Sequence, residues 1–170
     1  MKAGIIATIF LGLTDMLAAA TLVVDPAGGG DFTEIQPAID AAAAGDEVLV
    51  RPGEYVITEP ITFRGKAIAL RGEAGPGETV IRMADSPTDR NRASVVVFES
   101  GETEASVLQG FTLTRGKGIQ WGTPNTPESG GGGILCTSRS SPTVTGCTIS
   151  GNGARSGGGV YCGENSSPSL

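Results

Sequence analysis

Residues 131–136 read Gly-Gly-Gly-Ile-Leu-Cys, and residues 157–162 read Gly-Gly-Gly-Val-Tyr-Cys. The second stretch follows the first at a displacement of 26 positions. The same displacement relates Ser-Ser-Pro-Thr at 140–143 to Ser-Ser-Pro-Ser at 166–169. An internal repeat of this length is typical of a solenoid, in which each repeat forms one coil and stacks on the next.

An earlier coil aligns with the repeat at a larger displacement. Residues 108–113 read Leu-Gln-Gly-Phe-Thr-Leu and match Val-Thr-Gly-Cys-Thr-Ile at 144–149, 36 positions later. The additional positions indicate an insertion between these coils, within residues 117–129. Long insertions on solenoids often lie on the binding face.

Short apolar runs that end at Gly or Pro predict strands along the rest of the chain. They lie at 48–50, 61–63, 68–70, 80–83 and 95–98. The two-residue Asn-Gly connections that favour antiparallel hairpins do not occur between them. We therefore expect an all-β fold, a right-handed parallel β-helix.

The alternation of side chains along a strand assigns the inner face of each coil. It predicts that the interior receives similar residues from neighbouring coils, stacked about 4.8 Å apart. These residues are Leu108, Phe111, Leu113, Ile134, Cys136, Val144, Cys147, Ile149, Val160 and Cys162. Because Cys136 and Cys162 fall at one position, we expect a ladder of buried thiols there; a disulfide is the alternative.

One amphipathic helix is expected, near the start of the domain. Thr33 and Gln36 have the spacing of a capping box, Ile35 and Ile39 begin an apolar stripe, and Gly45 ends the pattern. A solenoid leaves its core and strand edges open at each end. We therefore expect this helix to cap the N-terminal end.

Residues 1–20 have the pattern of a secretory signal peptide. Lys2 precedes an apolar stretch, and small residues at 18–20 match a cleavage site. The stretch is too short to span a membrane. Export to the cell exterior or surface is expected; an uncleaved buried strand is the alternative.

The remainder, 21–170, is interpreted as one domain with a cap at 21–47 and coils at 48–170. The repeat stops at Leu170 before its last coil is complete. We therefore expect a C-terminally incomplete β-helix, with further coils of the same chain beyond this residue.

The composition excludes several classes of function. The formal net charge is −6, which argues against nucleic acid as a partner, since such surfaces need clustered Lys and Arg. The chain contains no histidine, so no catalytic site can use one and no metal site can rely on imidazole. Three cysteines cannot all pair within one chain, which argues against a disulfide scaffold.

The repeats at 140–152 and 157–162 resemble the coils of pectin-lyase-like β-helix proteins, in particular bacterial secreted and cell-surface proteins. Residues 30–42 and 50–55 are also similar to the opening of pectin methylesterases. The resemblance implies the fold and a link to polysaccharides. It does not extend to the Asp-containing catalytic motifs of the esterases or to the calcium-ligand set of pectate lyases, which have no counterpart in this chain.

Trp121, the only tryptophan, lies in the insertion close to Arg115 and Lys117. An exposed indole stacks on sugar rings, and a neighbouring cation pairs with a uronate carboxylate. Tyr161 points outward from the last repeat and extends this candidate glycan-binding surface. The alternative is that Trp121 folds back onto the coil beneath it.

Asp85, Asp89 and Asn91 are oxygen-bearing residues in one short segment and form a weak candidate site for Ca²⁺. Their spacing matches no EF-hand loop, so a solvated loop is the favoured interpretation. No other metal and no cofactor is expected.

No catalytic residue can be identified, because the aligned coils present mostly Ser, Thr and Gly outward. We therefore expect a structural, adhesive or glycan-binding module whose partner is a polysaccharide or cell-surface glycan. The alternative is a polysaccharide-active enzyme: a pectate or uronan lyase, a pectin esterase or a glycoside hydrolase.

Overall fold

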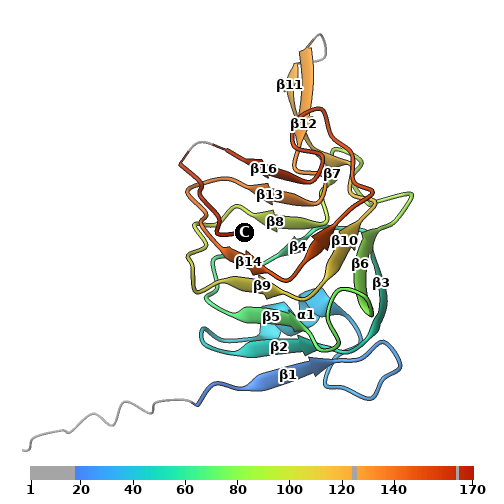
Figure 1. Cartoon of the computed structure of the whole chain (residues 1–170), viewed down its shortest axis with the longest axis vertical. Coiled ribbons are helices and arrows are strands. Elements are labelled where there is room, and N and C mark those ends of the chain that lie inside the picture. The colour runs from blue at the N-terminus through green and yellow to red at the C-terminus, as the bar shows by residue number, and fades with distance from the viewer. Residues whose placement is uncertain (1–17, 124–125, 164) are drawn as a thin grey trace, which may run out of the picture.

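A computed structural model describes residues 18–123, 126–163 and 165–170. Most of the expected signal peptide lies outside these residues, so its cleavage stays a prediction. Within them, the chain forms short strands and one short helix (Figure 1). That helix is too short to cross a membrane, and no other is found in the described residues.

Three parallel sheets form the walls of the molecule. Sheet 1 contains β1 (Thr21–Val24), β2 (Glu47–Val50), β5 (Ala69–Gly72), β9 (Val107–Gln109) and β14 (Thr143–Thr145). Sheet 2 contains β3 (Gly53–Ile57), β6 (Thr79–Met83), β10 (Thr112–Thr114) and β15 (Thr148–Ile149). Sheet 3 contains β4 (Ile61–Thr62), β8 (Val96–Phe98), β13 (Ile134–Cys136) and β16 (Val160–Cys162).

The chain visits the three sheets in turn and then begins the next coil. The successive coils are β2-β3-β4, β5-β6-β8, β9-β10-β13 and β14-β15-β16, and every pairing within the three sheets is parallel. The fold is therefore the expected right-handed parallel β-helix. In Figure 1 the strands β1, β2, β5, β9 and β14 lie above one another in chain order, and so do β4, β8, β13 and β16.

The pairing confirms both displacements found in the sequence. Ile134 pairs with Val160, and Cys136 with Cys162, at a displacement of 26. Leu108 pairs with Val144 at a displacement of 36. Similar residues therefore stack in register, which is why each coil can bury the apolar face of its neighbour.

The turn from sheet 1 to sheet 2 is tight and depends on glycine. Gly110 and Gly146 occupy equivalent places in consecutive coils and have φ angles of 79° and 58°. Side chains other than glycine are disfavoured at such angles. At Gly110 a Cβ would also lie 3.0 Å from the carbonyl oxygen of Gly72.

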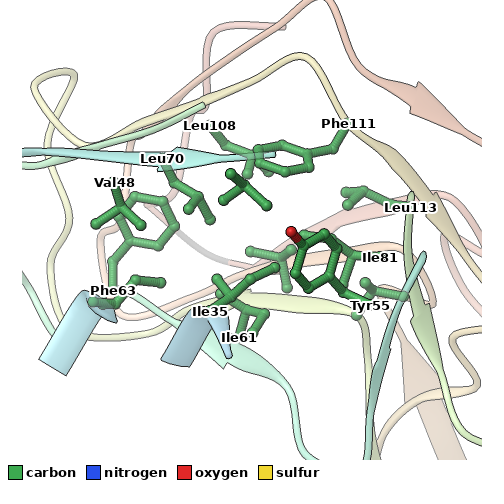
Figure 2. Packing of buried hydrophobic residues seen from close by; sticks show 14 of the residues in the cluster. Ile35, Val48, Tyr55, Ile61, Phe63, Leu70, Ile81, Leu108, Phe111 and Leu113 are labelled. Atoms are coloured by element: carbon green, nitrogen blue, oxygen red, sulfur yellow. The ribbon is translucent and has the colours of Figure 1, made fainter. Parts of the chain in front are cut away.

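Apolar side chains from all three walls fill the interior. Figure 2 shows Val48, Leu70 and Leu108 of sheet 1 and Ile81 and Leu113 of sheet 2 among the side chains that fill this interior. All five are fully or almost fully buried. Burying each such side chain stabilises the fold by about 1.5–3 kcal/mol relative to exposing it.

The helix α1 (Ile35–Ala41) caps this interior, as expected, with Ile35 and Ile39 buried against it. The capping box was a wrong prediction. The helix begins after Glu34, and no side chain caps its N-terminus. Its C-terminal end is stabilised instead by Lys66, whose ammonium donates to the carbonyls of Ile39, Asp40 and Ala42 at 2.8–2.9 Å.

The insertion forms an antiparallel hairpin of β11 (Gly118–Thr123) and β12 (Thr126–Gly130). β11 also pairs with the short strand β7 (Arg92–Ala93). The sequence placed an insertion within 117–129 but showed no strand signal there. In Figure 1 the hairpin stands away from the stacked coils.

The cysteine positions are confirmed, but only one thiol is fully buried. Cys136 and Cys162 are register partners and neither is in a disulfide. Cys136 is buried, whereas Cys162 is exposed because β16 is an edge strand of sheet 3. Cys147 is half-buried, and its thiol donates to the carbonyl of Thr145 at 3.5 Å.

Candidate functional site

The outward face of sheet 3 carries a column of apolar residues. Val97, Leu135 and Tyr161 are in register on β8, β13 and β16. Val97 and Leu135 are buried although they do not belong to the interior cluster. The chain before β13 covers part of this column, since a Cβ at Gly131 would lie 2.7 Å from the Leu135 side chain.

Trp121 of the hairpin packs against the end of this column. Its ring centroid lies 5.2 Å from that of Tyr161, with the ring planes tilted by 49°. The indole remains 39% exposed. The structure therefore brings these two predicted site residues together and combines both interpretations of Trp121, because one part of the ring packs on the protein and another faces solvent.

Gly130 makes this packing possible. A Cβ at this position would lie 2.5 Å from Cη2 of Trp121 and 3.0 Å from Cγ of Tyr161. Contacts this short cannot be accommodated without moving the rings. The absence of a side chain at Gly130 therefore allows the two aromatic residues to meet.

Arg115 and Lys117 both contact Asp85, a residue that the sequence analysis placed in the candidate calcium site. Nη1 of Arg115 lies 3.0 Å from Oδ1 of Asp85. The ammonium of Lys117 donates to the backbone carbonyl of Asp85 at 2.8 Å. Both cationic groups are thus engaged with the same loop residue.

The other calcium candidates lie in an ordinary turn. Oδ1 of Asp89 accepts the backbone N–H of Asn91 at 2.8 Å, and both side chains are exposed. Among the described residues there is no group of three or more Cys, Asp or Glu side chains that could hold a metal ion. Calcium binding by Asp85, Asp89 and Asn91 stays an untested prediction.

A groove of about 990 Å³ opens beside α1, β3 and β4. Its walls also include the turn between β3 and β4, the loop before β7 and the residues that follow β8. The lining combines apolar side chains, such as Val56 and Ile57, with charged ones. The charged lining residues are Glu34, Glu54, Glu59, Arg64, Asp89, Arg92 and Glu99.

Hydrogen bonds between neighbouring segments hold the walls of the groove together. Gln36 and Thr62 both line it, and the Gln36 amide makes two hydrogen bonds with the Thr62 backbone, at 2.9 and 3.1 Å. On another wall, the N–H of Thr88 donates to the carbonyl of Thr58 at 2.9 Å. The groove is therefore built on paired elements.

Both arginines of the groove are already paired with carboxylates. Arg92 forms a two-point ion pair with Glu99, in which one contact, Nη1 to Oε2, measures 3.1 Å. Arg64 lies 3.1 Å from Asp40, which is outside the groove. The positive charge of the lining is thus largely compensated.

Sequence reasoning missed this groove, apart from Asp89. Glu34, Glu59 and Asp89 come from segments that do not resemble one another, and no repeat relates them. Their proximity depends on the register of the first two coils, which the sequence does not reveal. Asp89 was selected for its oxygen atoms alone.

The chain is similar to a protein of Arabidopsis thaliana described as probable pectinesterase 67, with 34% identity over 93 residues. The match covers 52% of this chain and 27% of that protein, so the chain spans about a quarter of the length of this curated relative. No protein-family model and no solved structure matches the chain. The similarity and the parallel sheets together support a pectin-lyase-like β-helix.

Proposed function

We propose that this protein binds a polysaccharide, with one part of the sugar chain seated in the groove beside β4. The groove of about 990 Å³ is the observation that carries this proposal. Its size is at the upper end of the range usual for ligand sites, about 300–1,000 Å³. The relative described as a pectinesterase supports a saccharide as the ligand class.

The lining suits the two kinds of surface that a sugar presents. A sugar ring has apolar C–H faces and a rim of hydroxyl groups. Val56 is 50% exposed and Ile57 is half-buried, so both offer apolar contact. The carboxylates of Glu59 and Glu99 accept hydrogen bonds from hydroxyl groups.

The aromatic pair provides a second contact. The exposed part of Trp121, supported by Tyr161, is suited to stacking on a sugar ring. Arg115 and Lys117 contribute less than the sequence suggested, because both are engaged with Asp85. We therefore assign binding to the groove and to the two rings.

An extracellular glycan is reached only by an exported protein. We propose that the N-terminal signal directs secretion to the cell exterior or surface. We also propose that binding needs no cofactor.

A catalytic role is the second candidate. Glu59, Glu99 and Arg92 line one groove, and two carboxylates that converge on a substrate can act as acid and base. An assay for methanol or unsaturated uronides released from pectin, with wild type and Glu59→Gln compared, tests this alternative.

Calorimetric titration with soluble hexasaccharides tests the binding function. Val56→Ser should weaken binding, because the exposed Val56 side chain lines the groove and supplies apolar contact to a sugar ring. Trp121→Ala should weaken binding by about 5–150-fold, since one stacking contact on an aromatic side chain is worth roughly 1–3 kcal/mol. The proposal is wrong if neutral, cationic and anionic hexasaccharides all fail to bind the full chain.

A further inference from the structure

We infer that the groove selects an amino-sugar polymer that carries free ammonium groups and rejects a polymer of uronates. This inference rests on the proposed function, because it specifies which class of polysaccharide the same groove takes. It departs from what a pectinesterase relative suggests. The charges of the lining and their partners carry the argument.

The groove is lined by more acidic than basic residues. The ion pairs of this region do not neutralise all of the acidic residues. Glu99 is neutralised by Arg92, and Glu54 by Arg82, which lies outside the lining. Glu34, Glu59 and Asp89 make no ion pair with any residue that the structure describes. Three carboxylates thus face the groove without a cationic partner.

Two of these carboxylates come from segments that are far apart in the sequence but are joined by a backbone hydrogen bond. The N–H of Thr88 donates to the carbonyl of Thr58 at 2.9 Å. Asp89 and Glu59 directly follow these two residues and both line the groove. Glu59 and Asp89 therefore enter the lining from two segments that this backbone hydrogen bond holds together.

The third carboxylate comes from a different part of the lining. Glu34 precedes α1, which is joined to β4 by the Gln36–Thr62 hydrogen bonds. A sugar chain in the groove therefore encounters negative charge from α1 as well as from Glu59 and Asp89. Ammonium groups along a polymer can approach several of these carboxylates.

Charge and hydrogen bonding both favour the amino sugar. The ammonium group of an amino sugar offers three donors and a positive charge, whereas the carboxylate group of a uronate offers only acceptors and a negative charge. Both arginines that could receive a uronate are already paired, Arg92 with Glu99 and Arg64 with Asp40. A uronate would meet like charge without compensation.

The expected effect of each carboxylate is modest, since all three are exposed. An exposed ion pair typically contributes about 0.2–1 kcal/mol, which corresponds to an affinity change of up to about fivefold. Salt screens such contacts, with a Debye length of about 8 Å at roughly 0.15 M. Preference for the cationic chain should therefore weaken as salt is added.

Calorimetric titration of the full chain with three hexamers tests the inference: glucosamine, N-acetylglucosamine and galacturonate. We expect the glucosamine hexamer to bind most tightly and the galacturonate hexamer least tightly at low salt. Glu34→Gln, Glu59→Gln and Asp89→Asn should each weaken glucosamine binding by up to about fivefold. Each should weaken binding of the neutral N-acetylglucosamine hexamer less than it weakens binding of the glucosamine hexamer, because only the charged contact is specific to the ammonium group.

Glu73→Gln is the matched control, because this exposed glutamate lies outside the groove. It should leave all affinities unchanged. Glu59→Lys should lower the affinity for glucosamine and raise that for galacturonate. Thermal unfolding of every variant verifies that the fold is intact.

The possible outcomes separate this inference from the proposed function. If the neutral hexamer binds and the glucosamine hexamer binds no more tightly, charge selection is wrong and glycan binding stands. If the galacturonate hexamer binds tightly and Glu59→Lys does not raise its affinity, charge selection is also wrong and glycan binding stands. If no hexamer binds, both the inference and the proposed function are wrong.

Discussion

The side-chain amide of Gln36 pairs with both backbone groups of Thr62. Its Oε1 accepts the Thr62 N–H at 2.9 Å, and its Nε2 donates to the Thr62 carbonyl at 3.1 Å. Thr62 lies on β4, an edge strand of sheet 3. The amide thus occupies the place of a neighbouring strand and satisfies an edge that would otherwise be open to association.

Replacing Gln36 with Ala should destabilise the fold, because two backbone groups of Thr62 would lose their partner. The expected loss is about 1–3 kcal/mol in the free energy of unfolding, measured by denaturant titration. Gln109→Ala is a suitable control, since Gln109 is an exposed residue of sheet 1. Equal stability of the Gln36 and Gln109 variants would contradict the capping role.

Glu102 joins three coils from a buried position. Its carboxylate accepts hydrogen bonds from the N–H of Gly65 and Ser100, both at 2.9 Å, and from the hydroxyl of Ser140 at 2.8 Å. Glu102→Ala should lower the free energy of unfolding by about 1–3 kcal/mol, because buried donors lose their acceptor. Glu104→Ala, at an exposed position nearby in the sequence, should have little effect on the same denaturant curve.

Asp46 should contribute to stability at neutral pH and lose this contribution in acid. The backbone N–H groups of Ala20 and Ala43 hold the pKa of its carboxyl below the usual value. A pKa that is lowered in the folded state stabilises the fold above the unfolded pKa, about 3.9, and the effect is lost as pH falls through the folded value.

Asp46→Asn should therefore reduce stability at pH 7 and flatten its decline below about pH 4, as measured by denaturant unfolding across pH. Cleavage after Ala20 would remove one of the two donors, so the effect should be smaller in a chain that begins at Thr21. An Asp46→Asn curve parallel to that of wild type throughout the acid range would contradict this role.

The cysteines should differ strongly in reactivity. Burial, aided by the neighbouring Cys162, raises the pKa of the Cys136 thiol to about 12. The thiolate is the reactive form, so alkylation at pH 8 should modify exposed Cys162 and spare Cys136. Peptide mass analysis measures the two sites, and denaturant should restore labelling of Cys136. Equal labelling rates of Cys136 and Cys162 in the native protein would contradict the burial of Cys136.

Gly130→Ala should separate the two aromatic rings, since its Cβ would lie 2.5 Å from Trp121. Trp121 is the only tryptophan, so its fluorescence reports this site directly. We expect greater quenching by acrylamide in the variant. Gly77→Ala is the control, because a Cβ there meets nothing within 4 Å. If quenching is unchanged in Gly130→Ala, the rings do not pack as described.

The sequence predicted the helix well but not its capping. Ile35 and Ile39 face the interior as their spacing indicated. The Thr33–Gln36 pattern suggested a capping box, yet Gln36 bonds with Thr62 instead. A local pattern cannot reveal that an unpaired strand edge lies within reach of the side chain. The Thr62 backbone comes within reach of the Gln36 amide only in the folded chain.

The candidate site was predicted in part. Trp121 and Tyr161 were both expected on the outer surface, and the structure adds that their rings pack against each other. The engagement of Arg115 and Lys117 with Asp85 was not anticipated. It depends on a loop of another coil, 30 residues away along the chain from Arg115.

The sequence by itself determined the coil repeat, the register of the coils from Leu108 onward and the interior residues of those coils. Similar side chains recur at 26 and 36 positions because each coil must match the apolar face of the next. The tertiary structure alone decided the groove, since Glu34, Glu59 and Asp89 belong to segments without a shared pattern. Exposed charges need no periodic spacing, because no packing against a neighbouring coil constrains them.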